Sequence, residues 1–109
     1  MFILLLTYLK NLAEIDALLP DHWNYLERNY REGTFLLSGR QVPRTGGVIL
    51  AAGDDVEAIR KITQTDPFVR AGAARYDIVQ MTPTAASGTL SASLAASGLQ
   101  GITTIQPTT

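Results

Sequence analysis

The sequence contains no cysteine, which excludes disulfide cross-links, thiolate metal sites and cysteine nucleophiles. Histidine is almost as scarce, because His22 is the only one in the chain. Zinc usually binds about three or four protein ligands, so a lone histidine without cysteine argues against a zinc site. We therefore expect neither a metal nor a cofactor, and the lack of cysteine is compatible with a reducing compartment.

Charge clusters are also missing. Nine basic and ten acidic residues give a formal net charge of −1, and lysine and arginine do not gather in any segment, which argues against a nucleic acid partner. Long apolar runs are missing too, since the apolar segment 2–6 is much too short to span a bilayer. Polar residues rather than a cleavage site follow it, so we expect a cytoplasmic protein without a membrane partner.

The C-terminal part of the chain has no charged residue from Ile78 onward, and Ala, Ser, Thr and Gly dominate residues 84–101. We therefore divide the 109 residues into one domain, 1–83, and a C-terminal extension, 84–109. Two leucines four residues apart fit a short helix in the extension, and residues 102–105 fit an edge strand. The composition of the extension fits a flexible tail nearly as well.

The N-terminal segment 2–9 is apolar at both parities, which is typical of a strand covered on both faces. A short helical piece follows and is expected to end at Pro20. The main helix is predicted from Pro20 to Glu32, before a glycine that stops it. Its inner stripe is expected to contain Trp23, Leu26 and Tyr30.

The rest of the domain shows a second run of strands and one more helix. The pattern predicts a strand at 34–38, a turn or short extension at 39–45, and a strand at 48–52 that Gly46 and Gly47 open. A helix capped by Asp54 and stopped by Pro67 and a strand at 73–81 follow. This order predicts an α+β, ferredoxin-like βαββαβ fold, with both helices on one face of an antiparallel sheet. Because the strands are apolar on both sides, we expect the other face to be buried in a homodimer, as a dimeric α+β barrel.

This topology brings the start of the main helix and the end of the second helix to the same end of the sheet. His22 and Asp66 are expected to meet there. An imidazolium at a helix N-terminus and a carboxylate at a C-terminus are each disfavoured by roughly 0.3–1 kcal/mol, and pairing them offsets part of that effect. A carboxylate also orients a histidine and supports its work as a proton acceptor.

Several segments together resemble the YCII-related family over residues 1 to about 83. The resemblance rests on His22 followed by Tyr25-Leu26, Gly33, Phe35 to Gly39, Gly46 to Leu50 and Asp66 to Gly72. It implies a dimeric α+β barrel similar to muconolactone isomerase, and a histidine–aspartate active site formed by His22 and Asp66. It also implies acid/base elimination or rearrangement of small, often aromatic-derived, compounds. Arg40 stands where many relatives have the proline of a Ser-Gly-Pro segment.

Five further side chains are candidates for binding a small-molecule substrate: Tyr8, Ser38, Arg40, Arg44 and Arg70. The arginines could clamp a carboxylate by bidentate hydrogen bonds, although an ordinary solvated or ion-paired arginine is the commoner case. Arg70 could equally be the ion partner of Asp66. Ser38 lacks the surroundings of a nucleophile elbow, so we expect it only to line the pocket.

Two functional hypotheses follow. The first is a cofactor-independent lyase or isomerase in which His22 moves a proton and Asp66 orients it. The alternative is a dimeric ligand-binding or regulatory module without a reaction, in which His22 packs at a helix start and Asp66 is a turn residue. A heme or quinol oxygenase is less favoured, because a single histidine at this helix start lacks the surroundings of such sites.

Overall fold

The computed structural model describes residues 1–108 as a four-stranded sheet with helices on one face, followed by a small separate unit. The elements are β1 (Phe2–Tyr8), α1 (Leu12–Arg31), β2 (Phe35–Arg40), β3 (Gly46–Ala51), α2 (Val56–Thr63), α3 (Pro67–Arg70), β4 (Ala74–Gln80), β5 (Ala85–Ser87), α4 (Gly88–Ala96) and β6 (Thr103–Ile105). The order of the elements from β1 to β4 confirms the α+β prediction, with α3 as an additional short helix.

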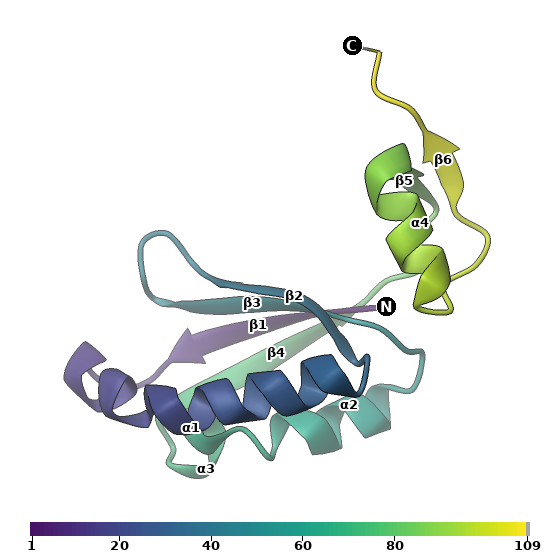
Figure 1. The fold of residues 1–109 in the computed structure, drawn as a ribbon. Coiled ribbons are helices and arrows are strands. Elements are labelled where there is room, and N and C mark those ends of the chain that lie inside the picture. The colour runs from purple at the N-terminus through teal and green to yellow at the C-terminus, as the bar shows by residue number, and fades with distance from the viewer. Residues whose placement is uncertain (109) are drawn as a thin grey trace.

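The main sheet has the strand order β2-β3-β1-β4, and all its neighbours are antiparallel. β1 lies in the middle, where Leu4 is opposite Ile49 on one side and Ile78 on the other. Figure 1 shows α1, α2 and α3 together below this sheet. This arrangement is that of a ferredoxin-like fold.

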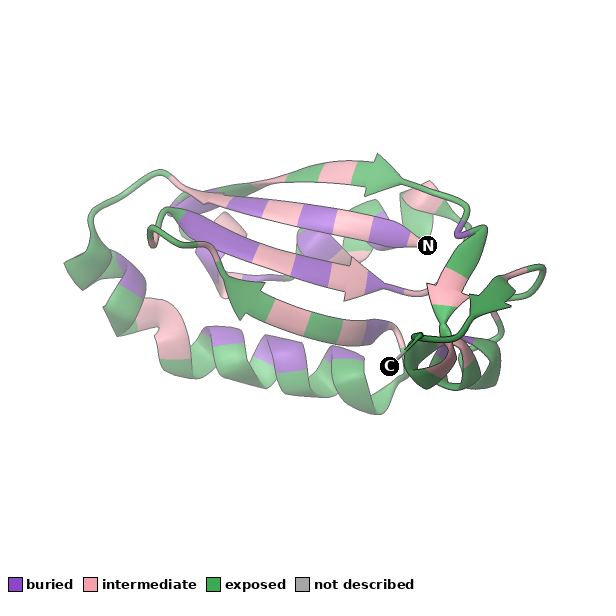
Figure 2. Cartoon of the chain, turned by 90° about the horizontal axis from the view of Figure 1, so that it is seen from above, coloured by how far each residue is buried: buried purple, intermediate pink, exposed green. Residues whose placement is uncertain are grey.

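The core lies between the sheet and the helices. Alternate residues of β1 point into it, and Figure 2 shows the resulting alternation of buried and partly buried residues along the central strands. The main cluster comprises Phe2, Leu4, Tyr25, Leu26, Phe35, Ile49, Ala51 and Ile59. Burial of this apolar surface is the principal stabilising contribution to the fold.

The opposite face of the sheet carries no helix and is also largely apolar. The register places Ile3 opposite Leu50 and Leu5 opposite Val48 on this face, and all four are partly buried. Leu37 pairs with Leu50 beside them and is 61% exposed. These five side chains form the open sheet face: Ile3, Leu5, Leu37, Val48 and Leu50.

α1 is one continuous helix, so the prediction of two helical pieces divided at Pro20 is wrong. The Asn11 side chain accepts a hydrogen bond from the Glu14 N–H at 3.0 Å and starts the helix. Pro20 is exposed, so the carbonyl that loses its partner is accessible to water. Packing of residues on both sides of Pro20, including the fully buried Ile15, holds the two parts in one helix.

The predicted inner stripe of this helix is correct only for Leu26, which belongs to the core. Trp23 is 63% exposed and Tyr30 is 37% exposed. The buried stripe instead passes through Ile15, His22, Tyr25 and Asn29. The main helix therefore turns its histidine, rather than its tryptophan, toward the interior.

Asp66 lies just beyond the end of α2, as the proline after it predicts, and it also starts a further helix. α2 starts one residue later than predicted, because Asp55 rather than Asp54 caps it, and it ends at Thr63. Asp66 is the N-cap of α3, where its Oδ1 accepts the Phe68 N–H at 2.9 Å. The carboxylate therefore lies at the favourable end of a short helix rather than at the unfavourable end of a long one.

β2 is longer than the strand predicted at 34–38. It continues to Arg40, so Gly39 and Arg40 extend the strand. β3 starts at Gly46, as predicted, and Gly46 is opposite Thr7 of β1. A Cβ atom at Gly46 would lie 1.7 Å from the Leu6 carbonyl oxygen, so this close approach requires glycine.

The extension forms β5, α4 and β6, and Figure 1 shows it beyond the end of β1 that carries the N-terminus. The predicted short helix is present, and Leu94 is its buried residue. β6 does not extend the main sheet, because it pairs in parallel with β5 in a sheet of its own. Within the described residues 1–108, no helix is long and apolar enough to cross a membrane.

Candidate functional site

Asp66 is completely buried and accepts three hydrogen bonds. Its Oδ1 lies 2.9 Å from His22 Nδ1 and 2.9 Å from the Phe68 backbone nitrogen. Its Oδ2 accepts the Tyr76 hydroxyl proton at 2.6 Å. A buried carboxylate is tolerated only when it is fully paired, and these three donors from α1, α3 and β4 provide that pairing.

His22 is 8% exposed and is fixed on two sides. Its ring stacks on Phe68, with ring centroids 4.2 Å apart and an interplanar angle of 16°. The contact with Asp66 is made by Nδ1. If an ionised Asp66 accepts a hydrogen bond from Nδ1–H, Nε2 of the neutral ring is the nitrogen that can accept a proton. The residues predicted to meet are therefore in direct contact.

Tyr76 and Tyr25 lie behind this pair. Burial raises the pKa of Tyr76, and the nearby Tyr25 and Asp66 raise it further. Burial is also the main cause of the raised pKa of Tyr25. The Tyr25 hydroxyl has no hydrogen-bond partner among the residues that the structure describes. Both phenols therefore stay protonated, and Tyr76 is a permanent donor to Asp66.

A cavity of about 390 Å³ opens beside His22. Its wall is formed by Leu6, Tyr8, Leu19, His22, Trp23, Leu26, Ser38, Gly39, Arg40, Arg44, Gly47, Val48, Ile49 and Phe68. A few polar groups in a mostly apolar wall are typical of a small-molecule site. The predicted substrate-binding residues of strands β1 and β2 and of the following turn thus share one cavity with His22.

Arg70 does not line this cavity. It lies at a second, more polar depression of about 570 Å³, between α1 and the segment from Lys61 to Arg70. It makes no ion pair with Asp66, whose hydrogen bonds come from other groups. Among the residues from Met1 to Thr108, no group of three or more His, Asp or Glu side chains could hold a metal ion.

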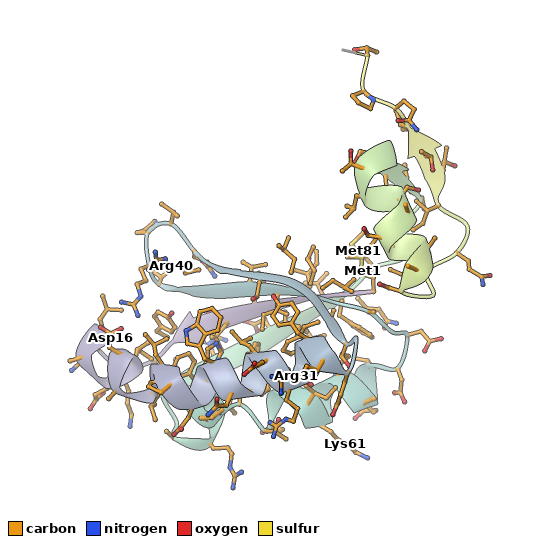
Figure 3. The ribbon with its side chains drawn as sticks, in the orientation of Figure 1. Met1, Asp16, Arg31, Arg40, Lys61 and Met81 are labelled. Carbon is orange, nitrogen blue, oxygen red and sulfur yellow. The ribbon has the colours of Figure 1, made fainter. Side chains whose placement is uncertain are left out.

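The polar residues that line the cavity differ in the hydrogen bonds and ion pairs that they form. The Ser38 hydroxyl lies 2.5 Å from the Tyr30 hydroxyl. Arg44 forms an ion pair with Asp16 at 2.5 Å, which raises the pKa of Arg44, and it also lies 6.0 Å from the centre of the Tyr8 ring. Figure 3 shows Arg40 on the β2–β3 hairpin, at the same end of the molecule as Asp16.

Comparison with known families decides the identity of this domain. The model of the YCII-related domain matches residues 1–82. The chain belongs to the YCII-related family. This confirms the resemblance inferred from the sequence motifs. No curated protein matches the sequence significantly.

The fold of this YCII-related domain also occurs in a solved enzyme structure. It is similar to 5-chloro-2-hydroxyhydroquinone dehydrochlorinase from Burkholderia phenoliruptrix AC1100, solved in complex with 2,5-dihydroxybenzoquinone. The TM-score is 0.60 and the sequence identity is 17%, over 76% of this chain and 95% of that one. At this identity the similarity shows a shared fold.

Sequence reasoning missed three residues of the YCII-related site. Tyr76 lies within the strand predicted at 73–81, where the sequence pattern gives it no functional role, yet its hydroxyl donates a hydrogen bond to Asp66. Phe68 contributes both a backbone donor and the ring that stacks on His22. Trp23 was expected in the core and instead lines the cavity. The Asp-Pro-Phe sequence carried a usable signal for Phe68, because an aspartate before proline commonly caps the next turn.

Proposed function

We propose that this chain is a cofactor-independent small-molecule enzyme of the lyase or isomerase type, with His22 as general base and Asp66 as the group that positions it. The observation that supports this proposal best is the 2.9 Å contact between His22 Nδ1 and the buried Asp66, at the wall of a 390 Å³ cavity. A histidine that lines a cavity and contacts a buried carboxylate is a common arrangement for proton transfer.

In the proposed reaction, His22 Nε2 removes a proton from a carbon of the bound ring. The C–H bond breaks, an N–H bond forms, and the electron pair enters a new double bond. In an elimination, a leaving group departs from the neighbouring carbon with its electrons. In an isomerisation, the electron pair of a neighbouring double bond of the ring shifts to a further carbon, and the imidazolium returns the proton to that carbon. Asp66 stabilises the transient imidazolium, and its own hydrogen bonds to Phe68 and Tyr76 keep it in place.

Ser38, Arg40, Arg44 and Tyr8 are proposed to contact the substrate, because all four line the cavity. The solved enzyme with the same fold supports a small-molecule lyase, since its name describes a dehydrochlorinase and its structure contains a quinone. Family membership supports the same class of site. Arg70 has no proposed role in substrate binding, because it lines the second depression rather than the cavity beside His22.

We also propose that the chain is a homodimer formed through the open sheet face. Ile3, Leu5, Leu37 and Leu50 would leave an apolar patch in water on a monomer, and such patches commonly mark interfaces. Most of the cavity wall comes from α1 and from the side of the sheet that faces it, so we expect each protomer to keep its own cavity.

The function is tested by incubating the protein with a panel of unsaturated ring acids, hydroxylated rings and lactones, followed by NMR in deuterated buffer. We expect at least one compound to lose a leaving group or to exchange a carbon-bound proton. His22→Ala should lower that rate by about a hundredfold or more, because it removes the proton acceptor. Equal rates in both proteins would remove His22 from the mechanism, and binding without conversion would favour a ligand-binding module.

A further inference from the structure

Building on the proposed function, we infer that the substrate of this site is a single unsaturated ring that carries a carboxylate, and that Arg40 binds the carboxylate. Three features of the cavity support this inference: the charge of its wall, the size and chemistry of its apolar part, and the space opposite Arg40.

The wall of the cavity carries positive charge without matching negative charge. Two guanidinium groups line it, and no aspartate or glutamate does. Asp66 is completely buried behind His22 and is not part of the wall. Asp16 pairs with Arg44 at 2.5 Å and neutralises much of that cation. An anionic ligand would supply the missing negative charge.

Arg40 is the arginine of the cavity wall that forms no ion pair within the described residues. It is exposed to solvent. A guanidinium group offers two parallel N–H donors, a geometry that matches a carboxylate. Arg44 already directs one such nitrogen to Asp16, so Arg40 is the better candidate for binding ligand.

The remaining wall suits a flat apolar ring. The rings of Tyr8, Trp23 and Phe68 line the cavity together with aliphatic side chains. A volume of about 390 Å³ lies toward the small end of ligand pockets, which favours a single ring over a larger skeleton. Aromatic side chains contact unsaturated rings favourably by offset stacking or edge-to-face contacts.

The strand register leaves space for the carboxylate. Arg40 is paired with Gly47 of β3, and Gly39 precedes it on β2. Gly47 lines the cavity and has no side chain, so no side chain of β3 lies directly opposite Arg40 on this face of the sheet. A carboxylate held there would leave the ring to extend along the apolar wall toward His22.

The test compares two acids, benzoate and cyclohexenecarboxylate, with their neutral amides, which have nearly the same shape. Trp23 is the only tryptophan and lies in the cavity wall, so its fluorescence reports occupancy. Isothermal titration calorimetry provides a second reading that does not depend on Trp23. The variants are Arg40→Gln and, as a control, Arg60→Gln, an exposed arginine on α2 away from the cavity.

We expect each acid to bind the unmodified protein about tenfold more tightly than its amide. Arg40→Gln should abolish that difference, whereas Arg60→Gln should preserve it. Added salt should reduce the difference in affinity between acid and amide in the unmodified protein, because the interaction is electrostatic and partly exposed. Failure of both acids to bind, equal binding of acid and amide, or a preference that survives in Arg40→Gln would each overturn the inference.

These results separate the substrate class from the catalytic proposal. A preference for acids that depends on Arg40, without conversion of any compound, would support the binding inference and contradict the proposed reaction. Conversion of neutral rings that depends on His22 but not on Arg40 would support the reaction and contradict the substrate class.

Discussion

At the scale of single residues, the site depends on how Asp66 is held. Its two oxygens form hydrogen bonds with the His22 ring, the Phe68 backbone N–H and the Tyr76 hydroxyl. Each donor comes from a different element of the fold. The carboxylate is therefore fixed before any ligand arrives, and it fixes the imidazole in turn.

Two neighbouring tyrosines provide a matched pair of variants. Tyr76→Phe removes a hydrogen bond to a buried carboxylate and should lower the free energy of unfolding by about 1.5–3 kcal/mol. Tyr25→Phe removes a buried hydroxyl without a partner in the described residues and should leave stability unchanged or raise it. Urea denaturation measures both. Equal losses of unfolding free energy in the two variants would mean that the hydrogen bond from Tyr76 to Asp66 does not stabilise the fold.

The sequence predicts some of the residues of the site but not all of them. His22 and Asp66 are found by following strand and helix directions, because the topology fixes which ends meet. Tyr76 is not found, since its role depends on the short helix α3 turning the chain so that β4 passes beside Asp66. The exposed position of Trp23 also escapes prediction, because a proline three residues before it obscures the phase of the helix.

At the scale of elements, the long helix α1 contains the main failure of local rules. Pro20 predicts an interruption, and the helix nevertheless continues to Arg31. Tertiary packing of residues such as Ile15 and Leu26 outweighs a local penalty of about 3 kcal/mol for proline in a helix. Two helix caps also differ from the prediction. Asp55 rather than Asp54 caps α2, because either of the two adjacent aspartates can act as an N-cap. Asp66 caps α3, a helix that the sequence pattern does not predict.

Replacement of Pro20 tests this explanation. Pro20→Ala restores an N–H that can bond to the Asp16 carbonyl and removes the clash of the ring, so the protein should become more stable by about 1–3 kcal/mol. Thermal unfolding followed by circular dichroism measures the change. Ala13→Pro, in the first turn of the same helix, should have a much smaller effect. A loss of stability in Pro20→Ala would show that the proline stabilises the site region.

At the scale of the whole molecule, the open sheet face is the feature that the single chain leaves unexplained. The sequence predicts it correctly from strands that are apolar on both sides, because helices cover only one face of a ferredoxin-like sheet. The separate β5–β6 sheet of the extension is not predicted, since short polar strands carry little pattern.

The proposed homodimer is tested by sedimentation at micromolar concentration. The unmodified chain should sediment as a dimer, and Leu5→Glu in the centre of the open sheet face should convert it to a monomer. Leu12→Glu, an exposed leucine at the start of α1, should leave the dimer intact. A folded monomer of the unmodified chain would contradict the proposal.

The proposed role of His22 as proton acceptor is tested most directly by the tautomer of this single histidine, measured by nitrogen NMR on labelled protein near neutral pH. We expect one set of imidazole signals, with the proton on Nδ1 in a hydrogen bond to Asp66 and with Nε2 unprotonated. A proton on Nε2 of the neutral ring would leave no base beside the cavity, and His22 could then not act as the general base.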